Sequence, residues 1–142
     1  MIKISDWIEN INWLDDPNTD IDAYCRKVEE DLEFDLLDKL NHWQEKGFVI
    51  LEGVVDHNLI DELLTDIQFI KKYRYGYELG VEYQGQQGNL EDFSQKQLND
   101  SGIKFNSIHN ISRAAEQLSL TKSVCDFLRH VFKDSPVLLQ SL

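Results

Sequence analysis

Residues 47–60 constrain the fold more than any other stretch, because they combine a helix end, a short apolar run and a helix start. Gly47 follows apolar residues at helical spacing and suits the left-handed position that closes a helix C-terminus. Residues 48–51 form an apolar run that is too short for a helix and predicts a buried strand. Asp56 can accept hydrogen bonds from the first backbone amides of the next helix. The local order is therefore predicted to be helix, strand, helix.

Apolar residues recur every three or four positions in several stretches, which predicts amphipathic helices. Ser5 can cap the first of these helices, and Thr19 with Asp22 resembles a capping box for the second. Asn110 or Ser112 can cap a helix later in the chain. The predicted helices run through residues 7–14, 21–28, 36–43, 59–70, 114–118 and 124–132.

Two more strands and a long loop are predicted in the second half of the chain. Residues 103–109 show imperfect apolar alternation, and residues 137–142 form an apolar run after Pro136. Residues 81–102 hold glycines, glutamines and acids with few apolar anchors, so they are predicted to form a loop. A loop of that length inside a compact domain is often a lid over a functional site, and this stretch is the candidate lid.

The net charge of −12 is concentrated in the N-terminal part of the chain. Residues 1–66 carry a net charge of −13, whereas residues 67–142 carry +1. Solvated helix faces explain this acidity, and so does a surface that docks a basic partner or mimics nucleic acid. Nucleic-acid binding by the acidic part is disfavoured, because it would repel phosphates. The basic and aromatic residues 71–77 can stack bases, but a helix end with packed tyrosines explains them as well.

Length and composition fit one globular domain, with 142 residues of which 42% are hydrophobic. No apolar run is long enough to cross a bilayer, and the N-terminus does not predict a signal peptide. Cys25 and Cys125 lie far apart, so free thiols in a reducing cytoplasm are expected, with a disulfide as the alternative. The sequence has no phosphate-binding glycine loop, no nucleophile elbow and no paired-cysteine metal site.

Four segments, taken in their order along the chain, resemble the phytanoyl-CoA dioxygenase family of Fe(II)- and 2-oxoglutarate-dependent oxygenases. They read GFVILEGVVD from Gly47, HNLIDELLTDI from His57, IKFNSIHNIS from Ile103 and VCDFLRHVFKDSPVLLQSL from Val124. The resemblance covers residues 36–142 in order, apart from residues 81–102.

The resemblance implies an α+β fold in which N-terminal helices lead into the first strands of a double-stranded β-helix core. This core is a jelly roll of the cupin type, which needs about eight strands, so it would be incomplete in this chain. Residues 1–142 are then expected to be a single domain or a domain fragment. Within them, residues 1–46 would form an acidic helical segment and residues 47–142 an oxygenase-like region.

The iron ligands of the family have no counterpart among the histidines of this chain. In the family, a His-x-Asp/Glu pair and a distant histidine hold the iron and leave three coordination positions open. None of His42, His57, His109 and His130 begins such a pair. No metal or cofactor is therefore expected in this chain alone, although a complete family member would use Fe(II) and 2-oxoglutarate. His57 is expected at the surface, and His42 and His130 at the surface or boundary of their helices.

Three polar residues are the candidates for facing substrate or cosubstrate. The resemblance implies that Gln140, on the last strand, faces the active-site cavity. It also implies that Asn106 and His109, on the strand at 103–109, form part of the wall of the substrate pocket. The alternatives are a polar residue at an exposed strand end for Gln140 and a structural role for His109, since a lone histidine is more often structural than a ligand.

Two functions from different classes follow. The first is the N-terminal part of a phytanoyl-CoA dioxygenase-like oxygenase that hydroxylates a small molecule, with this chain inactive alone because the iron ligands are absent. The second is a non-enzymatic acidic helical module that binds a protein partner through the apolar strand end or the tryptophan-bearing helices. A protein partner or second chain is expected to cover residues 137–142, since a lone strand leaves unpaired edges. Neither nucleic acid nor a membrane is an expected partner.

Overall fold

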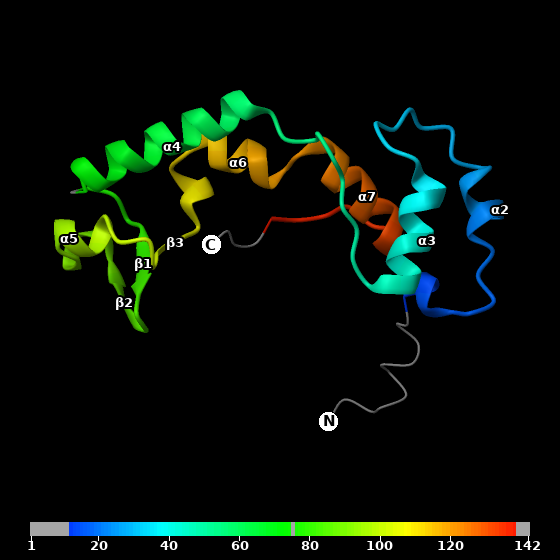
Figure 1. Cartoon of the computed structure of the whole chain (residues 1–142), viewed down its shortest axis with the longest axis horizontal. Coiled ribbons are helices and arrows are strands. Elements are labelled where there is room, and N and C mark those ends of the chain that lie inside the picture. The colour runs from blue at the N-terminus through cyan, green and yellow to red at the C-terminus, as the bar shows by residue number, and fades with distance from the viewer. Residues whose placement is uncertain (1–11, 75, 139–142) are drawn as a thin grey trace. The chain divides into compact units, whose positions relative to one another are not determined.

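The computed structural model describes residues 12–74 and 76–138, which form an α+β fold of helices and a small, open, three-stranded antiparallel sheet (Figure 1). The chain divides into two compact units. Unit 1 combines Met1–Val54 with Lys122–Pro136, and unit 2 combines Val55–Thr121 with Val137–Leu142. No helix in the described ranges is both long enough and apolar enough to cross a membrane.

Unit 1 is built from helices that pack around one apolar cluster. Its elements are η1 (Trp13–Asp15), α2 (Ile21–Cys25), α3 (Leu36–Lys46) and α7 (Lys122–Phe132). The core consists of Leu14, Ile21, Leu36, Leu40, Phe127 and Val131. The Phe127 ring lies 6.1 Å from that of Phe34 and 5.6 Å from that of Trp43, measured between centroids, so α7 closes the core that α3 begins.

Side-chain caps define where the helices of unit 1 begin. Asp20 accepts a hydrogen bond from the Ala23 amide at 2.8 Å, so α2 starts after Asp20. The predicted capping box at Thr19 is therefore wrong: the Thr19 hydroxyl donates instead to the Trp13 carbonyl. The predicted helix through residues 21–28 ends early, at Cys25. The prediction at residues 7–14 falls largely outside the described residues, and only Trp13–Asp15 is seen, as a 3-10 turn.

The connection between α3 and α4 (His57–Lys72) confirms two predicted caps and corrects one predicted strand. Gly47 closes α3 in the left-handed region with φ of 76°, and Asp56 accepts from the Asn58 amide at 2.9 Å. Residues 48–51, however, form neither strand nor helix. A strand requires a neighbour for its backbone hydrogen bonds, and the described elements of unit 1 are all helical.

Unit 2 packs helices against the sheet. Its elements are α4, β1 (Gly80–Tyr83), β2 (Gln86–Asn89), η2 (Leu90–Asp92), α5 (Gln95–Leu98), β3 (Ile103–Asn106), η3 (Ile108–Asn110) and α6 (Arg113–Ser119). The strand order is β2-β1-β3, and Val81 lies opposite both Gly88 and Phe105. The core consists of Ile70, Leu79, Val81, Leu90, Phe93, Leu98, Phe105, Ile108 and Ala115.

Helices α4 and α6 lie side by side (Figure 1). Ser112 joins them, because its hydroxyl donates to the Asp66 carboxylate at 2.6 Å and accepts from the Ala115 amide at 3.1 Å. Ser112, and not Asn110, is thus the N-cap of α6.

The predicted loop at residues 81–102 is wrong. These residues form most of the β1–β2 hairpin, η2 and α5, and they supply Val81, Leu90, Phe93 and Leu98 to the core of unit 2. The hairpin turns at Gln84 and Gly85, which both have positive φ, of 49° and 82°. Two-residue turns with positive φ match the twist of antiparallel strands. The candidate lid is therefore a structural part of unit 2.

The predicted strand at residues 103–109 is shorter than expected, and the one at residues 137–142 lies largely outside the described residues. The strand at 103–109 ends at Asn106, because Ser107 adopts a left-handed φ of 57° and a 3-10 turn follows. Residues 137 and 138 form no strand, and residues 139–142 lie outside the described residues.

Candidate functional site

Asn106 and His109, predicted to face substrate from one strand, do not share a strand. Asn106 is the last residue of β3, half-buried opposite Gly80, and its amide nitrogen would lie 3.5 Å from a Cβ at that glycine. His109, predicted on the same strand, lies instead in η3, beyond the left-handed Ser107. Gln140 lies outside the described residues. The pocket-facing role of these residues stays a prediction.

The four histidines lie on four different helical elements. His57 is exposed at the first position of α4, as predicted, and half-buried His42 contacts the Phe48 ring at 5.0 Å between centroids. His130, predicted at the surface or boundary of its helix, is buried. Among the described residues, no three His, Cys, Asp or Glu side chains gather where they could hold a metal ion. The donors in this part of the chain therefore do not fit an Fe(II) site of the facial-triad type.

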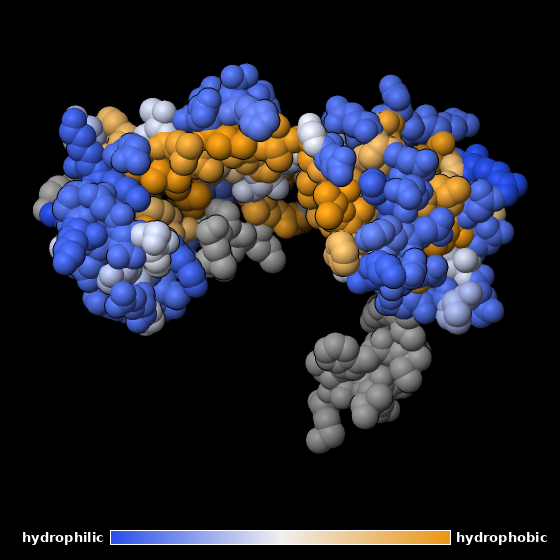
Figure 2. Space-filling view, viewed as in Figure 1, coloured by the Kyte–Doolittle hydropathy of each residue, from blue (hydrophilic) through white to orange (hydrophobic). Residues whose placement is uncertain are grey.

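Residues 48–51 form an apolar segment with two distinct faces, and this segment is the candidate interface of unit 1. Val49 and Leu51 pack against the core, whereas Phe48 is 52% exposed and Ile50 is 63% exposed. Figure 2 shows apolar surface along this part of unit 1. Alternation of buried and exposed side chains is the pattern of a β-strand. Within the described ranges, the backbone groups of residues 48–50 have no hydrogen bond to other backbone groups, and residues 52 and 53 form a turn. The segment thus has the side-chain pattern of a strand without a partner strand.

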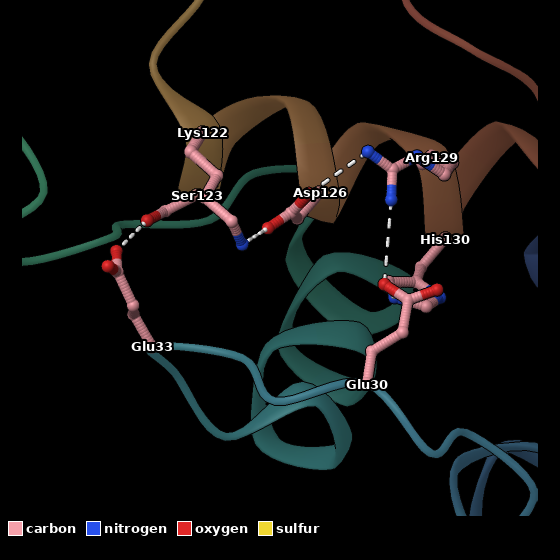
Figure 3. A network of polar contacts seen from close by, with 7 residues as sticks. All are labelled: Glu30, Glu33, Lys122, Ser123, Asp126, Arg129 and His130. Carbon is pink, nitrogen blue, oxygen red and sulfur yellow. Dashed lines mark hydrogen bonds and ion pairs between the residues drawn. The ribbon is translucent and has the colours of Figure 1, made fainter.

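A partly buried polar network joins α7 to the irregular segment at residues 26–35 (Figure 3). On α7, the nearly buried carboxylate of Asp126 accepts from Lys122 Nζ at 2.5 Å and from Arg129 Nη2 at 3.0 Å. These pairs follow helical spacing of four and three residues. The carboxylate is therefore neutralised by two cations whose side chains remain partly in solvent.

Two glutamates of the 26–35 segment complete this network. Glu33 accepts a hydrogen bond from the Ser123 hydroxyl, and Glu30 Oε2 lies 3.5 Å from Arg129 Nη1. The same Glu30 oxygen lies 3.7 Å from His130 Nε2. The Ser123 hydroxyl thus bonds a carboxylate and not an imidazole, so the network lacks the Ser–His pair of an activated nucleophile.

His130 lies at the inner end of the network and is 4% exposed. Its Nδ1 is hydrogen-bonded to the Tyr24 hydroxyl at 2.9 Å, and its Nε2 has no hydrogen-bond partner among the described residues. Burial lowers the pKa of His130; Arg129 lowers it further, whereas Glu30 and Asp126 oppose the shift. Burial also raises the pKa of Tyr24, with smaller contributions from Cys25 and Glu30.

The backbone around His130 is held by aromatic and amide donors. Trp13 Nε1 donates to the carbonyls of His130 and Val131 at 3.0 and 2.9 Å, and Asn12 donates to the Val131 carbonyl at 3.0 Å. Lys133 Nζ lies 4.0 Å from the Trp13 ring centroid. Trp13 is thus held against the core of unit 1.

An open depression of about 600 Å³ lies between the 17–22 turn and α3. Its two carboxylates already have partners, because Asp20 caps α2 and Asp22 pairs with Arg26. Gln44, on its α3 side, donates to the Leu14 carbonyl at 2.8 Å. The depression is therefore lined by groups that serve the fold.

No family model, no curated protein and no solved structure matches the chain.

Proposed function

We propose that this chain is the N-terminal part of a phytanoyl-CoA dioxygenase-like, Fe(II)- and 2-oxoglutarate-dependent oxygenase that hydroxylates a small molecule. In this proposal the chain supplies scaffold and part of the substrate-pocket wall, and it supplies no iron ligand. The observation that carries the proposal is the 48–51 segment, which has strand-like side-chain alternation and, among the residues that the structure describes, no partner strand.

The physical reason lies in what the segment leaves unsatisfied. Phe48 and Ile50 expose apolar surface. Burying such surface stabilises a protein by about 25 cal/mol for each Å² removed from water. The backbone beside Phe48 and Ile50 offers amide and carbonyl groups that a neighbouring strand could pair. A neighbouring strand of a jelly-roll core would cover the apolar side chains and pair the backbone groups at the same time. The segment stands where the resemblance expects the first strand, between a helix closed by Gly47 and a helix opened by Asp56.

The experiment compares the native gene product with the 142-residue chain. We expect the native protein to exceed 16.6 kDa by intact mass, to contain a His-x-Asp/Glu pair after Leu142, and to form succinate from 2-oxoglutarate in the presence of Fe(II). The 142-residue chain is expected to bind no Fe(II) tightly and to form no succinate. Stoichiometric Fe(II) binding with turnover by the 142-residue chain would contradict the proposal.

A paired substitution tests the segment itself. Phe48→Ser with Ile50→Ser is expected to change the stability of the 142-residue chain by no more than about 0.5 kcal/mol, because both side chains are exposed. In the longer native protein the same pair is expected to abolish succinate formation or soluble expression. Phe132→Ser, at an exposed position on α7, is the matched control. It is expected to leave both succinate formation and soluble expression unchanged.

The second candidate is an acidic module that binds a protein partner through the same segment. It is favoured by the segment's exposed apolar face and by the net charge of −13 over residues 1–66. A native mass of 16.6 kDa, together with loss of partner binding in the Phe48 and Ile50 double variant, would select it over the oxygenase.

A further inference from the structure

His130 is a buried titratable group of unit 1 whose Nε2 has no hydrogen-bond partner in the described part of the chain. Its Nδ1 is satisfied by Tyr24, but Nε2 is buried and its nearest charged neighbour, Glu30 Oε2, lies 3.7 Å away. That distance exceeds the range of about 2.7–3.2 Å for a hydrogen bond between nitrogen and oxygen. A neutral imidazole tolerates this arrangement, whereas an imidazolium carries two N–H donors that both need acceptors.

Charged and titratable groups face His130 from each element packed around it. Tyr24 approaches from α2, Glu30 from the 26–35 segment, and Asp126 and Arg129 from α7 itself. After α7, Lys133 Nζ lies 5.3 Å from the Tyr24 ring centroid. Asp126 already accepts from Lys122 and Arg129, and Glu30 is shared with Arg129. Arg129 thus lies beside both carboxylates, and its charge opposes a second positive charge on the ring.

Polar and apolar contacts together attach the 26–35 segment to α7. All of it lies outside the helices, since α2 ends at Cys25 and α3 begins at Leu36. Its polar contacts to α7 run through Glu30 and Glu33, and its apolar residues Leu32 and Phe34 pack on the core of unit 1. Figure 3 shows Glu30 reaching from this segment to Arg129 and His130.

We propose that His130 is a proton-sensitive latch, which holds the 26–35 segment on α7 while the imidazole is neutral and releases the segment when the imidazole gains a proton. The imidazolium needs a second acceptor at Nε2, and water can supply it when the segment moves away. This latch is independent of the proposed oxygenase function.

The direction of the pH effect follows from burial. The pKa of His130 is lowered in the closed state, so the open state binds the proton more readily. The latch therefore stabilises the closed state fully above the ordinary histidine pKa of about 6.5, and this stabilisation is lost as the pH falls from there through the lowered pKa. Between pH 7.5 and 6.0, the open population is expected to rise by up to about fourfold, the limit reached when only the open state is protonated.

Amide hydrogen exchange of the full chain, corrected for intrinsic rates, tests the latch. We expect amides of residues 26–35 to exchange up to about fourfold faster at pH 6.0 than at pH 7.5, while amides of α4 show no such change. His130→Gln keeps an acceptor for the Tyr24 hydroxyl but cannot titrate, so the pH effect should vanish. His57→Gln, at an exposed position on α4, should keep it.

Two results would overturn the latch. One is an unchanged pH effect on residues 26–35 in His130→Gln. The other, which needs no variant, is an NMR titration of the wild-type chain in which His130 takes up its proton at or above pH 6.5. If His130→Gln does not fold, this titration decides, and proton uptake below pH 6.5 together with faster exchange of the segment supports the latch.

Discussion

Replacing Phe127 with alanine is expected to lower the free energy of unfolding of unit 1 by about 3–5 kcal/mol. The Phe127 side chain is 2% exposed and contacts the rings of Phe34 and Trp43, so its removal leaves a cavity between α7 and α3. Small domains have a total stability of about 5–15 kcal/mol, so this loss would unfold a large share of the molecules at moderate denaturant concentrations.

Urea unfolding followed by tryptophan fluorescence measures the loss, because the three tryptophans all lie in the stretch that belongs to unit 1. Phe132→Ala is the matched control, since Phe132 lies on the same helix and is 59% exposed. The control is expected to shift stability by less than about 0.5 kcal/mol. Equal effects of the two substitutions would contradict the packing described for α7.

Replacing Val81 with aspartate is expected to destabilise unit 2 by more than about 3 kcal/mol. Val81 is fully buried in the central strand, where its cross-strand neighbours Gly88 and Phe105 have no side-chain donor for a carboxylate. A buried, unpaired charge either stays ionised at high cost or takes up a proton, and both reduce the stability of the folded state. The measurement is amide exchange of β1 and β3, whose protection should disappear.

The control for this substitution is Gln86→Asp, at an exposed position of β2. It introduces the same residue into the same sheet and is expected to leave protection unchanged. Comparing the two substitutions also distinguishes the fold described for residues 81–102 from a mobile loop. In a mobile loop, Val81→Asp and Gln86→Asp would have equally small effects, and that result would favour the lid predicted from the sequence.

Local chemistry explains which parts of the fold could be predicted from the sequence. Gly47, Asp56 and Ser112 each act within a few residues, through a left-handed backbone angle or a hydrogen bond to a nearby amide. The amphipathic patterns of α3, α4, α6 and α7 are likewise local, and these helices appear where the periodicity predicts them. These caps and helices are thus found at their predicted positions, whereas the capping box at Thr19 and the end of the helix at residues 21–28 are not.

Strands and buried polar groups could not be predicted in the same way, because they depend on distant partners. Residues 48–51 have the composition of a strand but no neighbouring strand among the described residues, whereas the polar residues 86–89 form one because β1 pairs with them. His130 is buried by Tyr24, which lies 106 positions earlier in the sequence. Of the candidate site, the sequence could identify the apolar character of 48–51 but not the burial of His130.

The discontinuity of unit 1 has a consequence for the order of folding during synthesis. Residues 55–121 of unit 2 leave the ribosome before α7 does, yet the core around Leu40 cannot close without Phe127. Unit 2 can therefore fold first and bring the two parts of unit 1 together, which reduces the entropy lost in closing the long connection between them. Until α7 arrives, Leu36 and Leu40 lack their final partners, so the nascent chain is most exposed to aggregation over this interval.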